Sequence, residues 1–260
     1  MNYKYCYIIE LQFLGFRFHG WQKQANVKTI HEMVDKTLSF VFEDIKFKTL
    51  GIGRTDSKVS ANSYFFQLFV ESEFNKLSFL EDLNSNFPND IKAISVRKVN
   101  VDFNIIQTPK IKEYNYFFSF GEKNHPFSAP FIVGFEEELD IDIMKVGAQL
   151  FRGNHCFHKY CTKPSEHTTF NRDIISCEIL ENTLYTANFF PKKSYVLNVK
   201  GSGFLRYQIR LIMGVLIQLG RGEVTIEFIK RSLQKDNDRK PLKTIAPSSG
   251  LQLYSIEFLN

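Results

Sequence analysis

Over the first hundred positions, segments in which apolar and polar residues alternate are followed by segments in which apolar residues recur at helical spacing. These two patterns predict strands and helices in turn. Strands are predicted over residues 3–14, 47–50, 64–70 and 91–101. A helix is predicted to begin near Thr29, which with Glu32 has the spacing of a capping box. A second helix is predicted over 73–84, with Leu77, Leu80 and Leu83 on one side. This β-α-β-β-α-β order is that of ferredoxin-like folds.

The second half of the chain repeats the mixture of strands and helices. Strands are predicted over residues 112–120, 173–180, 194–199 and 251–258, and helices over 141–151, 204–219 and 225–233. A long loop over 121–138 and a turn-rich segment over 154–171 separate them. Helices interleaved with mostly antiparallel strands favour the α+β class.

Composition narrows the class of protein. The chain has 260 residues, of which 43% are hydrophobic and 23% charged, as in ordinary soluble proteins. Its net charge of +5 is compatible with a polyanionic partner, and its 27 phenylalanines include rings available to stack on bases. No apolar run approaches the ~18 residues of a membrane span, no signal peptide is recognisable, and the four cysteines are sparse. We therefore expect a cytoplasmic protein that does not associate with membranes.

The segment Gly51–Ala61 lies between two predicted strands and carries an arginine, a hydroxyl and a carboxylate: Arg54, Thr55 and Asp56. Catalytic residues tend to lie on such loops, where a rigid scaffold presents them. Glycine, aspartate and serine also form ordinary hairpin turns. Asp56 is therefore either a catalytic carboxylate, which needs no cofactor, or a turn residue, and the two roles are compatible.

Two further segments carry candidate chemistry. Tyr114 and Tyr116 alternate along a predicted strand and share a face, either as core aromatics or as rings that stack on a flipped base. Arg210 lies four residues after Arg206 in a predicted helix that is apolar almost all round and is therefore expected to be buried. An arginine in such a helix needs a partner. Either Arg210 pairs with Asp56 and keeps that carboxylate ionised, or both arginines reach solvent or phosphate.

Basic residues gather around the first loop and the Asp56 loop, interleaved with aromatic rings, which suits phosphate contact with base stacking. The basic residues are Arg17, His19, Lys23, Lys28, Arg54 and Lys58, and the rings are Phe16, Phe18 and Trp21. The cluster of His155, Cys156, His158 and Cys161 lacks the paired spacing of zinc sites, so no metal is expected.

These motifs together resemble the TruA family of tRNA pseudouridine synthases, in order and across nearly the whole chain. The matching blocks are Phe18-His19-Gly20-Trp21-Gln22, Gly53-Arg54-Thr55-Asp56, Tyr114, Gly153-Asn154-His155, Arg172, Phe204 with Arg210, and Ala246-Pro247 with Gly250-Leu251. By this resemblance Asp56 is the catalytic nucleophile or base. The substrate-binding residues implied are Arg54, Tyr114, Arg210, Phe204, Arg172, His19, Trp21 and Gln22.

The resemblance implies two ferredoxin-like halves, residues 1–105 and 106–260, which share one mixed, mostly antiparallel sheet with helices on one face and a basic cleft on the other. It also implies isomerisation of uridine to pseudouridine at tRNA positions 38–40, without cofactor or metal. The partner implied is tRNA; no protein partner is expected, although a homodimer is compatible with the family.

The chain departs from the family in two places. Phe103-Asn104-Ile105-Ile106 lacks the arginine usual before the tyrosine, and Ser57-Lys58 follows Asp56 where bacterial members have Ala-Gly. Both changes concern residues around the catalytic set, so they bear on the choice of RNA more than on the type of reaction. The alternatives are an RNA-binding protein that keeps the scaffold without activity and a ferredoxin-like small-molecule enzyme.

Overall fold

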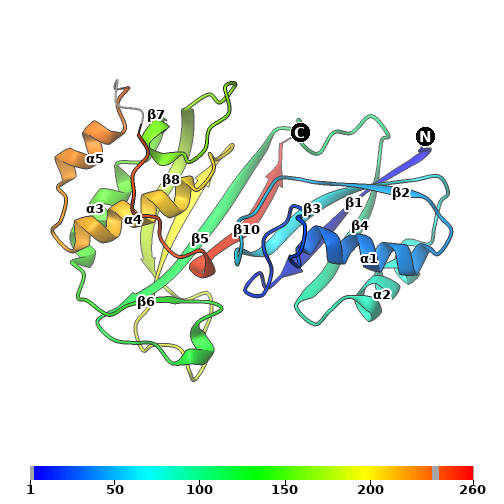
Figure 1. Ribbon diagram of the computed structural model, residues 1–260, viewed down its shortest axis with the longest axis horizontal. Helices are drawn as coiled ribbons and strands as arrows, with labels where there is room; N and C mark the ends of the chain where they lie inside the picture. The colour runs from blue at the N-terminus through cyan, green and yellow to red at the C-terminus, as the bar shows by residue number, and fades with distance from the viewer. Residues whose placement is uncertain (1–2, 236–239, 260) are drawn as a thin grey trace. The chain divides into compact units, whose positions relative to one another are not determined.

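The computed structural model describes residues 3–235 and 240–259, in which ten strands and five α-helices are found (Figure 1). This mixture confirms the expected α+β class. By compactness the chain divides into Met1–Pro109 with Leu253–Asn260, and Lys110–Gln252. The division into functional halves at residue 105 stays a prediction. Below, the first unit and the second unit are these two compact units.

In the first unit the strands lie in the order β4-β1-β3-β10, and β2 also pairs with β3. Their bounds are β1 (Tyr5–Phe13), β2 (Phe47–Gly51), β3 (Ser60–Val70), β4 (Ile91–Val99) and β10 (Leu251–Phe258), of which β10 belongs to this unit from Leu253 onward. β1 runs antiparallel to both β3 and β4. The predicted β-α-β-β-α-β order is confirmed.

The two helices of the first unit are α1 (Ile30–Phe42) and α2 (Lys76–Asn86), which lie side by side (Figure 1). α1 begins where the capping box predicts, since Glu32 N donates to Thr29 Oγ1 at 3.3 Å. The predicted apolar side of α2 is wrong at Leu77, which is exposed. α2 begins three residues later than predicted, and it buries Phe79 and Leu83, one turn apart, with Phe79 stacked on Phe42.

The second unit contains a sheet in the order β5-β9-β8-β7, with β6 parallel to β5. The strands are β5 (Lys110–Phe120), β6 (Val133–Phe135), β7 (Gly153–Cys156), β8 (Asn171–Glu181) and β9 (Tyr195–Gly201). β6 lies within the expected loop over 121–138, and most of β7 lies within the segment expected to be turn-rich. Both strands are short, three and four residues, so they carry too little periodicity to be recognised.

The helices of the second unit are α3 (Ile141–Gln149), α4 (Gln208–Gly220) and α5 (Ile226–Ser232). All residues of α4 except Arg210 and Gln218 are buried, which confirms the prediction of a buried helix. Its predicted start at Phe204 is wrong, because Tyr207 has the left-handed φ of +64° and the helix begins only after it. Arg206 therefore precedes the helix and does not share a helical face with Arg210. Over the described residues, no helix is long and apolar enough to cross a membrane.

Candidate active site

Asp56 lies in the connection between β2 and β3, and hydrogen bonds at both ends of this loop hold it. Before Asp56, the hydroxyl of Tyr64 on β3 donates to the carbonyl of Gly53 at 2.6 Å. After Asp56, the amide of Val59 donates to the Asp56 carbonyl at 3.2 Å. Asp56 is half-buried and Arg54 is exposed. The loop therefore has a fixed backbone and presents its arginine to solvent.

The loop that follows β1 packs directly on the Asp56 loop. Gly20 has a φ of +81°, and a Cβ at this position would lie 2.2 Å from the Thr55 carbonyl oxygen and 3.1 Å from that of Asp56. The next amide, of Trp21, donates to the same Thr55 carbonyl at 3.4 Å, and the Lys58 amide donates to the Phe18 carbonyl at 2.9 Å. Only glycine permits this approach, so Gly20 determines how the two loops meet.

Two aromatic rings of this first loop, Phe18 and Trp21, face the interior, which corrects the expectation that they stack on bases. Their exposed fractions are 1% and 2%. The Trp21 indole lies against Tyr64 and stacks on His31, with ring centroids 4.3 and 5.0 Å apart. Burying two large apolar rings stabilises the loop more than leaving them in water. Trp21 thus supports the Asp56 loop, whereas the neighbouring His19 and Gln22 are exposed.

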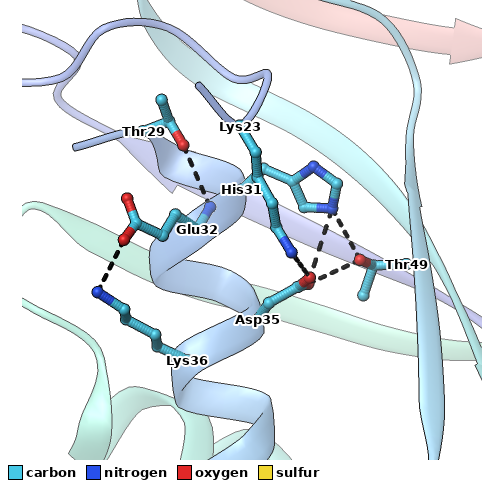
Figure 2. Close-up of polar contacts among 7 residues, drawn as sticks. All are labelled: Lys23, Thr29, His31, Glu32, Asp35, Lys36 and Thr49. Carbon is cyan, nitrogen blue, oxygen red and sulfur yellow. Dashed lines mark hydrogen bonds and ion pairs between the residues drawn. The ribbon is translucent and has the colours of Figure 1, made fainter. Parts of the chain in front are cut away.

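A polar network on α1 holds the ring that Trp21 stacks on. Figure 2 shows His31 Nε2 directed toward Thr49 and Asp35, with Nε2 2.8 Å from Thr49 Oγ1. Thr49 Oγ1 in turn donates to Asp35 at 2.7 Å, and Lys23 forms an ion pair with Asp35. Burial lowers the pKa of His31, although the Asp35 carboxylate opposes this. His31 is therefore a half-buried, neutral support for Trp21 at neutral pH.

The basic residues near the loop divide into paired and unpaired side chains. Arg17 forms an ion pair with Asp90, and Lys23 is held by Asp35. Within residues 3–235 and 240–259, Arg54 and Lys28 form no ion pair, and both are exposed. Lys58 extends over the ring of Phe16 at 5.6 Å. Arg54, Lys28 and Lys58 are the cations of this group that remain available to phosphates.

In the second unit, Tyr114 and Phe204 come together. Their rings meet edge to face, with centroids 5.3 Å apart and planes at 87°. Phe204 also covers Gly201 on β9, where a Cβ would lie 3.1 Å from the ring. Tyr114 is half-buried, whereas Tyr116 is fully buried and donates to the Pro247 carbonyl at 2.8 Å. Of the two tyrosines, Tyr116 is thus a core residue, and Tyr114 keeps an accessible part.

Arg210 is held in place by the segment before β10. Its Nε donates to the Ala246 carbonyl at 2.8 Å, and the Ala246 amide donates back to the Arg210 carbonyl at 3.0 Å. Its guanidinium lies over the Tyr207 ring at 4.7 Å, and Arg206 lies over the same ring at 5.3 Å. The side chain is therefore ordered by its own unit. Its pairing with Asp56 stays a prediction.

Arg172 lies at the start of β8, opposite His155 on β7. Its Nη1 donates to the carbonyls of Thr169 and Asn171 at 2.8 and 2.7 Å, and burial lowers the pKa of this guanidinium. Nearby, Cys156 Sγ lies 3.5 Å from His158 Nδ1. In the part of the chain that the structure describes, no group of three or more potential ligands could hold a metal ion.

Sequence reasoning missed two residues of this region. Tyr64 begins the predicted strand 64–70 and Lys112 begins the predicted strand 112–120, but neither is among the candidates selected from the motifs. No pattern in the sequence pairs Tyr64 with Gly53, because a hydrogen bond across a loop depends on how the loop closes. Lys112 has a detectable signal, since it lies two residues before Tyr114 and alternation places both on one face.

The mixed α+β fold is consistent with the pseudouridine synthase fold. A family profile described as tRNA pseudouridine synthase matches residues 148–258. The chain is 29% identical over 252 residues to tRNA pseudouridine synthase A of Aquifex aeolicus, covering 96% of this chain and 98% of that protein. Identity to the protein of the same name from Dictyoglomus thermophilum is also 29%, with the same coverage. For that from Listeria monocytogenes serotype 4a, identity is 27% over 94% and 95% of the two chains. These matches confirm the resemblance to the TruA family of tRNA pseudouridine synthases.

Proposed function

We propose that this protein is a tRNA pseudouridine synthase, an isomerase that converts uridine to pseudouridine with Asp56 as nucleophile or base. The relatives that share nearly its whole length bear this name. The observation that carries the proposal is the Asp56 loop, in which a half-buried carboxylate follows an exposed arginine on a backbone held by Tyr64 and Gly20. A positioned carboxylate suffices for the chemistry, because the reaction needs no redox step or external group.

The reaction rearranges bonds within one nucleotide. The bond between N1 of uracil and C1′ of ribose breaks, and the detached base rotates within the site. A bond then forms between C5 and C1′, C5 loses its proton, and N1 gains one, so atoms and charge balance. Asp56 acts as nucleophile or base in these steps.

The remaining residues bind and orient the RNA in this proposal. Arg54, exposed beside Asp56, assists extrusion of the target base. Tyr114, positioned by Phe204, stacks on the uracil. Arg210 pairs with Asp56 and holds it ionised, which the resemblance and the physical need for a charged partner both favour. Arg172, His19 and Gln22 contact the RNA, and Trp21 acts through the loop that it supports.

The decisive variant is Asp56→Asn, with Asp44→Asn at an exposed position as the matched control. The assay follows release of tritium from tRNA labelled at C5 of uridine, because formation of the C5–C1′ bond expels that hydrogen. Asp56→Asn should abolish release and keep most tRNA affinity, since phosphate contacts dominate binding. Near wild-type release by Asp56→Asn would refute the assigned role. Wild-type protein that binds tRNA without releasing tritium would favour the alternative, an RNA-binding protein without activity.

The finer parts of the proposal have their own tests. The resemblance implies modification at positions 38–40 in the anticodon stem-loop, so tRNA with cytidine at these positions should release no tritium. A homodimer is tested by sedimentation velocity of the purified protein. A cytoplasmic location is tested by fractionation of the cells that produce it.

A further inference from the structure

Lys112 on β5 lies beside the aromatic pair of the second unit. In the antiparallel ladder it is directly opposite Gly201 on β9, and opposed residues project from the same face of a sheet. Phe204 covers that same face at Gly201 and meets the ring of Tyr114. Since Lys112 and Tyr114 are two residues apart on one strand, the lysine stem leaves the sheet next to both rings.

The acidic and amide groups nearest in sequence are directed to the opposite face. Glu113 pairs with Lys200 at 3.5 Å and accepts from Asn198 Nδ2 at 2.6 Å. The same Asn198 amide donates to Asn115 Oδ1 at 2.8 Å. This polar network therefore lies on the face opposite Lys112 and does not compensate the charge of that lysine.

Lys112 forms no hydrogen bond or ion pair with any residue in 3–235 or 240–259. Burial and, to a smaller extent, the positive charge of Lys110 two residues away lower the pKa of Lys112 to about 8. A partly buried ammonium without an anion is unfavourable, and proteins place such groups where a ligand supplies the missing charge.

We propose that Lys112 binds a phosphate of the RNA strand at the nucleotide whose base stacks on Tyr114. The proposal rests on the proposed function, because it takes an RNA as the ligand. The ammonium is a compact charge on a flexible stem, which suits a phosphate that approaches along the sheet face. It adds a binding residue for the phosphate backbone in the second unit, beside the ring that contacts the base.

The experiment compares Lys112→Met with Lys200→Met, which removes a lysine of the same sheet from the opposite face. Affinity for tRNA is measured by filter binding over a series of salt concentrations. For Lys112→Met we expect affinity about tenfold lower at low salt, and the slope of log affinity against log salt smaller by roughly 0.7 to 0.9. Lys200→Met should keep the wild-type slope, because Glu113 already neutralises that lysine.

A second variant and a stability measurement separate binding from folding. Lys112→Arg should restore most of the affinity, because it restores the charge. Lys112→Met should unfold at no lower denaturant concentration than the wild type, since no residue that the structure describes pairs with the charge it removes. Wild-type affinity and slope for Lys112→Met, an equal loss for Lys200→Met, or failure of Lys112→Met to fold would each overturn the proposal.

The outcome is distinct from that of the proposed function. Tritium release by the wild type together with unaltered binding by Lys112→Met would refute the phosphate contact alone. Absence of release by a wild type whose tRNA affinity depends on Lys112 would refute the isomerase proposal and keep the contact.

Discussion

The contact between Gly20 and the Asp56 loop allows a sharp test of how this loop is positioned. In Gly20→Ala, the new Cβ would lie 2.2 Å from the Thr55 carbonyl oxygen, whereas ordinary contacts begin at 3.4 Å. The two loops must therefore separate by roughly 1 Å, and a displacement of that size near the reacting groups lowers turnover by up to about 100-fold. The φ of +81° adds about 1–2 kcal/mol to the loss of stability.

Gly222→Ala is the matched control for the cost of placing alanine at a positive φ. Gly222 also has a positive φ, +71°, but nothing lies within 4 Å of the Cβ position. Chemical denaturation should show that Gly222→Ala lowers the free energy of unfolding by about 1–2 kcal/mol, whereas tritium release per folded molecule should be unchanged. Gly20→Ala should lose at least as much stability and also most of its turnover. Equal turnover by both variants would refute the idea that the contact at Gly20 positions Asp56.

Three further predictions follow from the same unit. Tyr64→Phe keeps the ring that packs on Trp21 and removes the hydrogen bond to Gly53, so kcat should fall about tenfold at unchanged KM. Tyr160→Phe is the control for this variant, because it also removes a 2.6 Å hydrogen bond from a tyrosine hydroxyl, the one to Ser232. It should lower the free energy of unfolding by about 1 kcal/mol, as Tyr64→Phe does, without lowering kcat. If the two variants lost kcat equally, the role assigned to Tyr64 would be contradicted. Arg54→Met should lower single-turnover rates more than tRNA affinity if this arginine extrudes the base, and a change in filter-binding affinity alone would indicate a plain phosphate contact. Burial lowers the pKa of His31 in the folded state below its unfolded value of 6.5. As the pH drops below 6.5, the unfolded state therefore binds more protons than the folded state, and the free energy of unfolding should fall. His31→Gln should remove that part of the pH dependence in urea titrations, and an unchanged profile would contradict it.

Local rules made much of the fold predictable. The capping pair at Thr29 and Glu32 placed the start of α1, because the hydrogen bond that begins a helix involves neighbours in sequence. The apolar run after residue 204 predicted a buried helix, but not its start, since the left-handed conformation of Tyr207 lies in a turn that the hydrophobic pattern does not record. The apolar side of α2 was wrong at Leu77 because the helix begins later and buries Phe79 instead.

The residues of the candidate site also divide into those that the sequence selects and those whose role only the tertiary structure shows. Motifs alone selected Asp56, Arg54, Tyr114 and Arg210, because the residue types that carry chemistry are visible as letters. Only the tertiary structure showed that Trp21 is a buried support rather than a base-stacking ring, and that Lys112, on the face of Tyr114, has no partner among the residues that the structure describes. Burial and charge compensation depend on residues far apart in the chain, whereas capping and periodicity depend on neighbours. The sequence by itself therefore determined most of the longer elements and the catalytic candidates, and packing decided what each side chain does.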